Sequence, residues 1–178
     1  MTRRDDLLDR ATDHALEHGL IGLSLRPTAA ALGTSDRMLI YHFGSKDALV
    51  AAVLTVSNDR SIAAIRALEP SATPRQAILD LWDAWTAPAL ARCTRMYVEA
   101  AALGLFGREP YAASVREANE RWIAAVTAHL ERAGLSSARA GRVATLVDAT
   151  YNGLLLDRQL DDDAEPHRVV TDLADALG

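Results

Sequence analysis

A chain of 178 residues with 49% hydrophobic side chains can bury a core for one domain or two small ones. Its net charge is −5, and residues 1–50 hold six basic against seven acidic side chains, which excludes attraction to nucleic acid through a general basic field. The single cysteine excludes an internal disulfide and thiolate zinc clusters, and the lack of a run of about 18 uncharged apolar residues argues against a membrane span.

The first twenty residues are amphipathic and acidic rather than continuously apolar, so they do not resemble a secretory signal. We therefore expect the protein in the cytoplasm, with no membrane partner. We also expect no cofactor and no bound metal. His14 and His18 lie four residues apart on one helix, but they stand beside acidic residues in a pattern typical of a solvated face.

Apolar residues recur at helical spacing along almost the whole chain, and no stretch alternates with period two. The first helix ends at Gly19 and Gly22, and an acidic loop, Asp161–Glu165, precedes the last helix. After the first helix, further helices are predicted over residues 25–32, 35–41, 45–68, 74–88, 92–105, 109–132, 136–158 and 166–177. The fold class is therefore all-α, with about nine helices.

Side chains that can cap a helix precede several of these segments. Ser24, Ser35, Ser45 and Thr73 stand directly before the second to the fifth helix, where a hydroxyl can accept from the free backbone N–H groups of the first turn. Pro88 is expected to weaken or end the fifth helix.

Two short helices joined by a glycine-containing turn, after a supporting helix, describe a helix-turn-helix. Here these parts are Leu25–Leu32, the turn Gly33-Thr34, and Ser35–Tyr41. Ala29 and Leu39 are expected to hold the pair together from inside. Because the second short helix is too short to be stable alone, we expect its first turn to be presented to a DNA major groove.

Residues 41–46, which begin with the last residue of the second short helix, form an aromatic, histidine and lysine cluster, "YHFGSK". Tyr41 and His42 can donate to phosphate oxygens, while Phe43 is expected to be a buried anchor. Lys46 is the only lysine, and it begins a helix where the dipole disfavours a cation, which points to an external anion. Arg3 and Arg4 are either an arm that reaches the DNA backbone or the minor groove, or a frayed solvated end, with fraying slightly favoured.

These residues carry a family resemblance. The segment from Leu16 to Leu49, with Gly19, the Gly33-Thr34-Ser35 turn and the ending "YHFGSKDAL", resembles the DNA-binding domain of the TetR family of bacterial transcriptional regulators. The resemblance implies a DNA-binding domain at residues 1–46 and a C-terminal helical bundle for ligand binding and dimerisation at residues 47–178. It also implies a repressor that a small-molecule ligand releases from a palindromic operator.

The chain departs from the family pattern at two places. The family usually has a tyrosine at the position of Ile40, whereas the ring here is one residue later, at Tyr41. Asp36 and Arg37 stand where a small or basic pair is common, and Arg37 is our candidate for a guanine contact. DNA contacts are predicted at Ser24, Thr34, Ser35, Asp36, Arg37, Met38, Tyr41, His42 and Lys46.

Most of the aromatic residues lie after residue 50, where they either pack a core or line an apolar cavity with a few polar anchors. Glu99 lies in the apolar run "MYVEAAALGLF" and is therefore paired with an arginine such as Arg95, exposed, or an anchor. The ligand-binding residues are predicted as Trp82, Trp85, Met96, Tyr97, Glu99, Leu103, Phe106, Trp122, Asp148, Tyr151 and Asn152.

Small residues recur every four positions along the eighth helix and allow another helix to approach closely. We predict that this helix lies in a two-fold dimer interface, together with the last helix; the other interpretation is a central core helix. The predicted interface residues are Gly141, Thr145, Ala149, Gly153, Leu146 and Leu156.

Two other functions stay open at this point. A helical DNA-binding protein could respond to a protein partner or to no ligand, in which case its helical core would be filled. A small all-α enzyme is less favoured, because the sequence shows neither a phosphate-binding glycine loop nor a nucleophile elbow.

Overall fold

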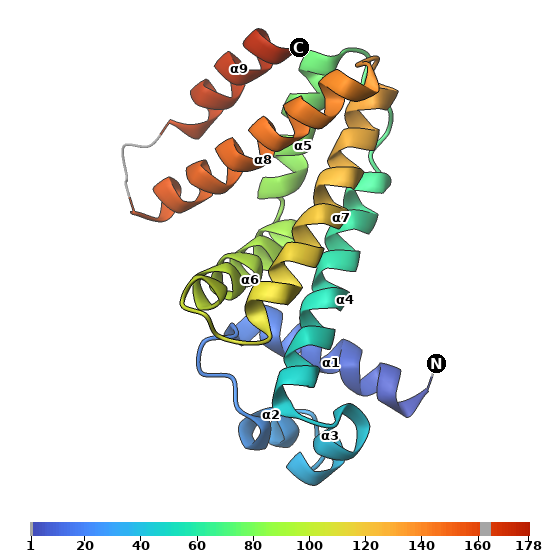
Figure 1. Cartoon of the computed structure of the whole chain (residues 1–178), viewed down its shortest axis with the longest axis vertical. Coiled ribbons are helices and arrows are strands. Elements are labelled where there is room, and N and C mark those ends of the chain that lie inside the picture. The colour runs from blue at the N-terminus through green and yellow to red at the C-terminus, as the bar shows by residue number, and fades with distance from the viewer. Residues whose placement is uncertain (1, 161–164) are drawn as a thin grey trace. The chain divides into compact units, whose positions relative to one another are not determined.

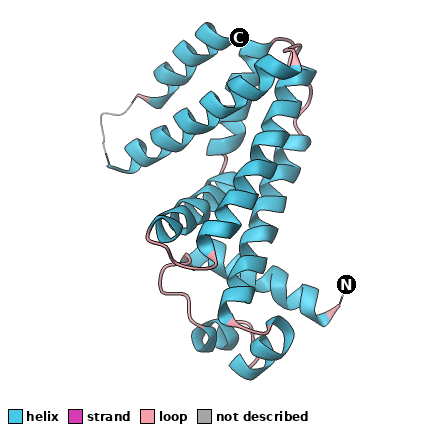
Figure 2. Ribbon diagram, viewed as in Figure 1, coloured by secondary structure: helices cyan, strands magenta, loops and turns pink. Residues whose placement is uncertain are grey.

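The computed structural model describes residues 2–160 and 165–178, and these residues contain nine α-helices and no strand (Figures 1 and 2). The prediction of an all-α fold is confirmed. The helices are α1 (Arg3–His18), α2 (Leu25–Ala31), α3 (Asp36–Phe43), α4 (Lys46–Arg66), α5 (Pro74–Thr86), α6 (Pro88–Leu105), α7 (Tyr111–Arg132), α8 (Ser137–Leu160) and α9 (Pro166–Leu177).

One helix start differs clearly from the prediction. Pro88 does not only follow α5: it is the first residue of α6, which begins four residues before the predicted start at Arg92. Proline suits this position because its missing N–H would have no partner there and its fixed φ fits the helix. The predicted acidic loop Asp161–Glu165 lies outside the described residues except for Glu165, which precedes α9 without a side-chain capping hydrogen bond.

The chain forms two compact units. The first contains residues 1–61 and 88–119, and the second contains residues 62–87 and 120–178. Helices α4 and α7 each contribute residues to both units. These units are defined by packing, whereas the predicted boundary after residue 46 separates a DNA-binding part from a ligand-binding part. That boundary stays a prediction.

The core of the first unit is built around the apolar stripe of α1. Leu7, Ala11, Ala15 and Leu16 are buried there, as the helical spacing predicts. They share one cluster with the following residues of α2, α3 and α4: Ala29, Leu39, Phe43, Leu49, Val50 and Val53. Burial of each large aliphatic side chain contributes about 1.5–3 kcal/mol, so this cluster fixes the short helices α2 and α3 that could not form alone.

Helix α4 is the one helix among the described residues that is long and apolar enough to cross a membrane, by length and composition. Several of its apolar residues are buried within the protein instead. Leu49, Val50 and Val53 are buried in the core of the first unit, and Ile62 and Ile65 are buried in the second. The helix therefore has the burial pattern of a core helix.

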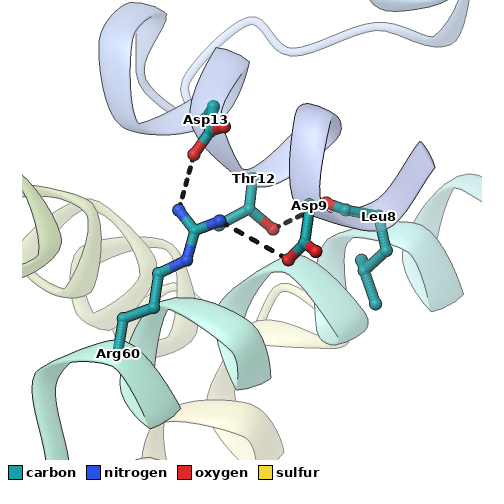
Figure 3. A network of polar contacts seen from close by, with 5 residues as sticks. All are labelled: Leu8, Asp9, Thr12, Asp13 and Arg60. Atoms are coloured by element: carbon teal, nitrogen blue, oxygen red, sulfur yellow. Dashed lines mark hydrogen bonds and ion pairs between the residues drawn. The ribbon is translucent and has the colours of Figure 1, made fainter. Parts of the chain in front are cut away.

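Arg60 of α4 also binds two carboxylates of α1 (Figure 3). Its guanidinium lies 2.6 Å from Asp13 and 3.5 Å from Asp9, and between them the Thr12 hydroxyl donates to the Leu8 carbonyl of its own helix. All three charged side chains are partly exposed, so water and salt screen the pairs.

Arg60→Met is therefore expected to lower the free energy of unfolding by less than about 1 kcal/mol, because exposed ion pairs contribute little. The difference should disappear in about 1 M salt. Urea denaturation at two salt concentrations measures it. A loss that is large and independent of salt would show that the pairs act as a buried network.

The second unit is held together by aromatic and aliphatic side chains. One face of α5 is buried, and so are the residues of α8 and α9 that pack in the same unit. These residues are Ala77, Ile78, Leu81, Trp82 and Trp85 of α5, Val143, Ala144, Val147 and Tyr151 of α8, and Val170 and Ala174 of α9. Arg75 and Asp175 join α5 to α9 at their exposed ends.

Candidate nucleic-acid interface

The turn between α2 and α3 has the geometry of a helix-turn-helix. Gly33 has a φ of 66°, a left-handed conformation that glycine adopts without strain. The Thr34 N–H donates to the Ala29 carbonyl at 2.9 Å, which closes the end of α2. Leu39 and Ala29 are both fully or almost fully buried, as predicted for the residues that join the two helices.

The start of α3 is fixed by its own side chains. The Ser35 hydroxyl accepts from the Met38 N–H at 3.2 Å, which confirms the predicted cap. Asp36 Oδ1 accepts from the Arg37 N–H at 2.9 Å. One carboxylate oxygen of Asp36 is thus used locally, and the other is free to accept from outside. Ser35, Asp36 and Arg37 are all exposed.

The next turn of α3 continues this exposed face. Tyr41 is 78% exposed, and Ile40 is 39% exposed although it is a large aliphatic residue. Met38 is half-buried, while Leu39 and Phe43 point into the core. The outward face of α3 therefore consists of Ser35, Asp36, Arg37, Ile40 and Tyr41.

His42 is only partly available for a phosphate. Its ring meets the Tyr41 ring edge to face, with centroids 5.1 Å apart. Its Nε2 atom is buried without a hydrogen-bond partner among the described residues, which leaves Nδ1 as the ring nitrogen that can donate to an external group.

Arg4 is ordered against the end of α3, contrary to the expectation of a frayed end. Its Nε donates to the His42 carbonyl at 3.3 Å, and its guanidinium lies 5.1 Å from the centre of the buried Phe43 ring. Thr2 and Asp5 form a capping box at the start of α1, which keeps this helix formed up to Arg3. Nothing in the sequence indicates that Arg4 contacts a segment 38 residues away.

Lys46 is exposed at the first turn of α4, where Ser45 accepts from the Ala48 N–H at 3.0 Å. Ser24 occupies the cap position of α2, but its side chain makes no capping hydrogen bond. The prediction that the Ser24 side chain caps this helix is wrong, because the residue three positions later is Pro27, which has no N–H to donate. The exposed Ser24 hydroxyl is free for an external partner. Thr34 is half-buried.

Two polar side chains of α6 bind the end of α1. Glu99 accepts from the backbone N–H groups of Leu20 and Ile21, at 2.6 and 3.0 Å. Four residues earlier, Arg95 donates to the carbonyls of Leu16 and Glu17. One carboxylate oxygen of Glu99 therefore has backbone partners 78 and 79 residues away, which the sequence did not indicate, and its assignment as a ligand anchor stays a prediction.

The ligand-binding residues predicted from the sequence fall into both compact units. Those in the first unit are Met96, Tyr97, Glu99, Leu103 and Phe106; those in the second are Trp82, Trp85, Trp122, Asp148, Tyr151 and Asn152. Phe106 is 85% exposed in the loop after α6, which contradicts its assignment to an enclosed cavity. A pocket of about 320 Å³ in the second unit is lined by Leu68, Glu69, Asp80, Asp83 and Ala84, none of them predicted.

The predicted residues of the second unit include an aromatic cluster. The rings of Trp85 and Trp122 meet edge to face with centroids 4.7 Å apart, and Tyr151 lies 5.2 Å from Trp85 and 5.0 Å from Trp82. The Tyr151 hydroxyl donates to the Ile78 carbonyl, and burial raises the pKa of this hydroxyl.

Several polar atoms in this cluster lack a hydrogen-bond partner among the described residues. They are the indole nitrogens of Trp82, Trp85 and Trp122 and the side-chain oxygen of Asn152. Burial raises the pKa of Asp148 to about 6, an effect that the nearby Trp122 indole and Asn152 amide partly offset. Buried polar groups normally have partners, so these atoms are the unsatisfied polar groups of the cluster, and the pocket of about 320 Å³ is lined by other residues.

Ser71, Asp80 and His129 also meet in the second unit, but not as a catalytic triad. The Ser71 hydroxyl donates to Asp80 at 2.6 Å rather than to His129, which lies 3.5 Å away. His129 is fully buried, and burial together with the neighbouring Arg132 lowers its pKa. A serine whose hydroxyl donates to a carboxylate lacks the histidine general base that the triad mechanism uses.

The rings of His14 and His18 stack on α1 with centroids 4.2 Å apart. The pKa of His14 is lowered mainly by burial and to a smaller extent by the positive charge of His18. Among the described residues, no group of three metal-ligating side chains includes them.

The small residues of α8 do not pack inside the chain. A Cβ atom added to Gly141 or Gly153 would meet nothing within 4 Å, and Thr145 and Ala149 are exposed. Leu146 and Leu156 are exposed at 49% and 45%. The opposite side of the helix, with Val143 and Val147, is buried. The alternative of a central core helix therefore does not fit this face, which is open.

The comparisons with known proteins agree with this geometry. Residues 7–53 match the family model described as bacterial regulatory proteins, tetR family. The solved structure of a transcriptional regulator from Rhodococcus sp. Rha1 is similar over 99% of this chain and 94% of that chain, with a TM-score of 0.75 and 24% identity. No curated protein sequence matches the chain.

Two other solved structures contain ligands. A transcriptional regulator from Saccharomonospora viridis in complex with choline is 18% identical and covers 97% of this chain and 93% of that chain, with a TM-score of 0.69. The multidrug binding protein EbrR complexed with proflavin is 20% identical and covers 99% of this chain and all of that chain, with a TM-score of 0.72.

The turn between α2 and α3 and the buried contacts behind it are those of a helix-turn-helix domain. Residues 7–53, which contain this domain, match the TetR family of bacterial regulatory proteins, and the chain as a whole has the fold of solved transcriptional regulators.

Proposed function

We propose that the protein binds DNA sequence-specifically and represses transcription until a small-molecule ligand releases it. The observation that carries this proposal is the outward face of α3, where Ser35, Asp36, Arg37, Ile40 and Tyr41 are exposed on a helix that the core holds rigidly. Because the net charge is −5, no general basic field attracts DNA, and the affinity for DNA has to come from the individual side chains on this face.

The proposed contacts divide into two kinds. Arg37, Asp36 and Met38 face base edges in the major groove, with Arg37 bound to a guanine and the free oxygen of Asp36 to a cytosine amino group. Phosphate contacts come from the exposed groups around them: Ser24, Thr34, Ser35, Tyr41, His42 through Nδ1, and Lys46.

The direct test is a selection of DNA from random oligonucleotides with the purified protein. We expect an enriched palindrome whose half-sites are about one helical turn or a multiple of it apart. Repeating the selection with pools of metabolites should abolish the enrichment with the pool that contains the effector. A selection that enriches no sequence would refute the proposed function.

Lys46→Ala is expected to weaken binding to all DNA sequences and to reduce the slope of log affinity against log salt by about 1 for each protomer, because one phosphate contact is lost. Arg66→Ala is the matched control: it removes one exposed cation from the same helix, about 30 Å further along. Fluorescence anisotropy at several salt concentrations measures both. Equal slopes for the two variants would remove Lys46 from the interface.

We also propose that the protein acts as a homodimer through α8 and α9. The open small-residue face of α8, with Gly141, Gly153 and the exposed Leu146, supports this, because a second helix can approach it closely. The proposed interface residues are Gly141, Thr145, Ala149, Gly153, Leu146 and Leu156. A monomer in analytical ultracentrifugation at micromolar concentration would contradict the dimer.

For the effector, we propose an organic cation held in the second unit by Asp148 and the aromatic rings of Trp85, Trp122 and Tyr151. Asp148 is half-buried, and the described residues contain no ion pair with it. A cation beside an aromatic face and a desolvated carboxylate is bound by both. The similarity to a regulator in complex with choline, a quaternary ammonium ion, supports this class.

Binding of such a cation is expected to weaken about tenfold between pH 8 and pH 5. The pKa of Asp148 is about 6, so only about one tenth of the carboxylate is ionised at pH 5. All three tryptophans lie in the second unit, so quenching of their fluorescence by choline or benzyltrimethylammonium measures binding.

Asp148→Asn should bind more weakly and show no change over this pH range. The neutral isostere 3,3-dimethylbutanol is the ligand control. If it binds the wild-type protein as well as choline does, the positive charge is not recognised and the proposed class is wrong.

The ligand would act by binding one arrangement of the dimer more tightly than the other, which changes the spacing of the two α3 helices. A regulator that responds to a protein partner instead would keep its DNA preference and show no fluorescence response to any small molecule. We place the protein in the cytoplasm, where its DNA is. Nothing in the Ser71, Asp80 and His129 arrangement favours an enzyme.

A further inference from the structure

Ile40 is an unusual residue on the outward face of α3. It is 39% exposed and does not belong to the core cluster of the first unit, to which its neighbour Leu39 belongs. It lies one turn after Asp36 and Arg37, at helix spacings of four and three residues, so all three side chains share one face. An exposed branched aliphatic side chain therefore stands among charged groups at the proposed DNA surface.

Its chemistry limits what it can contact there. Ile40 can neither donate nor accept a hydrogen bond, so it gains nothing from phosphates or from polar base edges. The 5-methyl group of thymine is the one apolar group that the base pairs present in the major groove. Contact with this methyl group removes apolar surface of both partners from water.

We propose that Ile40 contacts the 5-methyl group of a thymine and makes one position of each half-site specific for thymine. This inference rests on the proposed function, since it requires α3 to lie in a major groove. It identifies a specificity-determining residue that acts by apolar contact, beside the polar contacts of Arg37 and Asp36.

The geometry of α3 also places the thymine. Residues 37 and 40 are separated by about 4.5 Å along the helix axis, at about 1.5 Å per residue. Successive base pairs are about 3.4 Å apart. If α3 follows the groove, the thymine lies one or two base pairs from the guanine that Arg37 binds.

The test uses the palindrome obtained by selection. Each thymine of a half-site is replaced by uracil, which pairs in the same way but lacks the methyl group, and the affinity is measured for the wild-type protein and for Ile40→Ala. We expect one position at which uracil weakens wild-type binding about fourfold in one half-site and about 15-fold in both. At that position Ile40→Ala should bind thymine and uracil equally.

Two controls separate this contact from other effects. Ile40→Val keeps a branched apolar side chain and should retain part of the thymine preference, and Tyr41→Phe should retain all of it. Because Ile40 is exposed, Ile40→Ala should keep the helical circular dichroism of the wild type.

The outcomes distinguish this inference from the proposed function. If the protein enriches no DNA sequence, the proposed function fails and this inference fails with it. If a palindrome is enriched but the wild type and Ile40→Ala respond identically to uracil at every thymine, the inference alone is overturned.

Discussion

Arg37→Ala is expected to remove most of the base preference of the protein. The guanidinium stands exposed in the first turn of α3, where it can bind guanine O6 and N7 with two hydrogen bonds. Losing this contact should cost about 1–3 kcal/mol for each half-site, which is about 5- to 150-fold per half-site and about 30- to 25,000-fold for the selected palindrome, because both protomers carry the substitution. Anisotropy titrations with the palindrome and with unrelated DNA measure the change.

Comparison with Lys46→Ala distinguishes a base contact from a phosphate contact. Removal of a phosphate contact lowers affinity for both DNAs alike, whereas removal of a base contact lowers only the affinity for the palindrome. The ratio of the two affinities should therefore fall for Arg37→Ala and stay constant for Lys46→Ala. An Arg37→Ala protein with unchanged affinity and unchanged ratio would show that α3 does not read the groove through this residue.

Local hydrogen bonding explains why several helix starts were predictable. Ser35, Ser45 and Thr73 each accept from an N–H three residues later, so the sequence alone contains both partners. Ser24 occupies the same kind of position without the bond, because the residue three positions later is Pro27, which has no N–H to donate. The residue type at a cap thus predicts where a helix begins. It does not by itself predict that the side chain makes the capping hydrogen bond.

Contacts between distant segments could not be predicted in this way. The sequence shows that Glu99 is a carboxylate in an apolar run, and this predicts that it has a partner. It does not show that the partners are backbone groups at Leu20 and Ile21. The spacing of Arg95 and Glu99, four residues apart on one face of α6, was the available signal that they act together.

The ligand residues were the least predictable part. The tryptophans at 82 and 85 were correctly placed on one face of α5, but their spacing is the same for a filled core and for a lined cavity. Unpaired indole and amide groups around Asp148 become visible only when three helices are brought together. Exposure of Ile40 is hidden for a similar reason, since its sequence pattern fits a core position.

Gly19→Ala is expected to destabilise the first unit by about 3 kcal/mol, whereas Gly22→Ala should cost only about 1 kcal/mol. Both glycines have a φ of 84°, so both substitutions strain the backbone. A Cβ atom at Gly22 meets open space, but one at Gly19 would lie 2.9 Å from the carboxylate oxygens of Glu99. The carboxylate would have to leave the two N–H groups that it binds, which costs charge-assisted hydrogen bonds.

A double-mutant cycle isolates this contribution. In a Glu99→Ala background, the cost of Gly19→Ala should fall, because no carboxylate remains to be displaced and only the backbone strain is left. Far-UV circular dichroism in urea is the appropriate measurement, since the tryptophans report only the second unit. Exchange of the Leu20 and Ile21 amide protons should accelerate in Gly19→Ala and not in Gly22→Ala. Equal costs for both glycines would show that the bonds from Glu99 do not hold α6 to the end of α1.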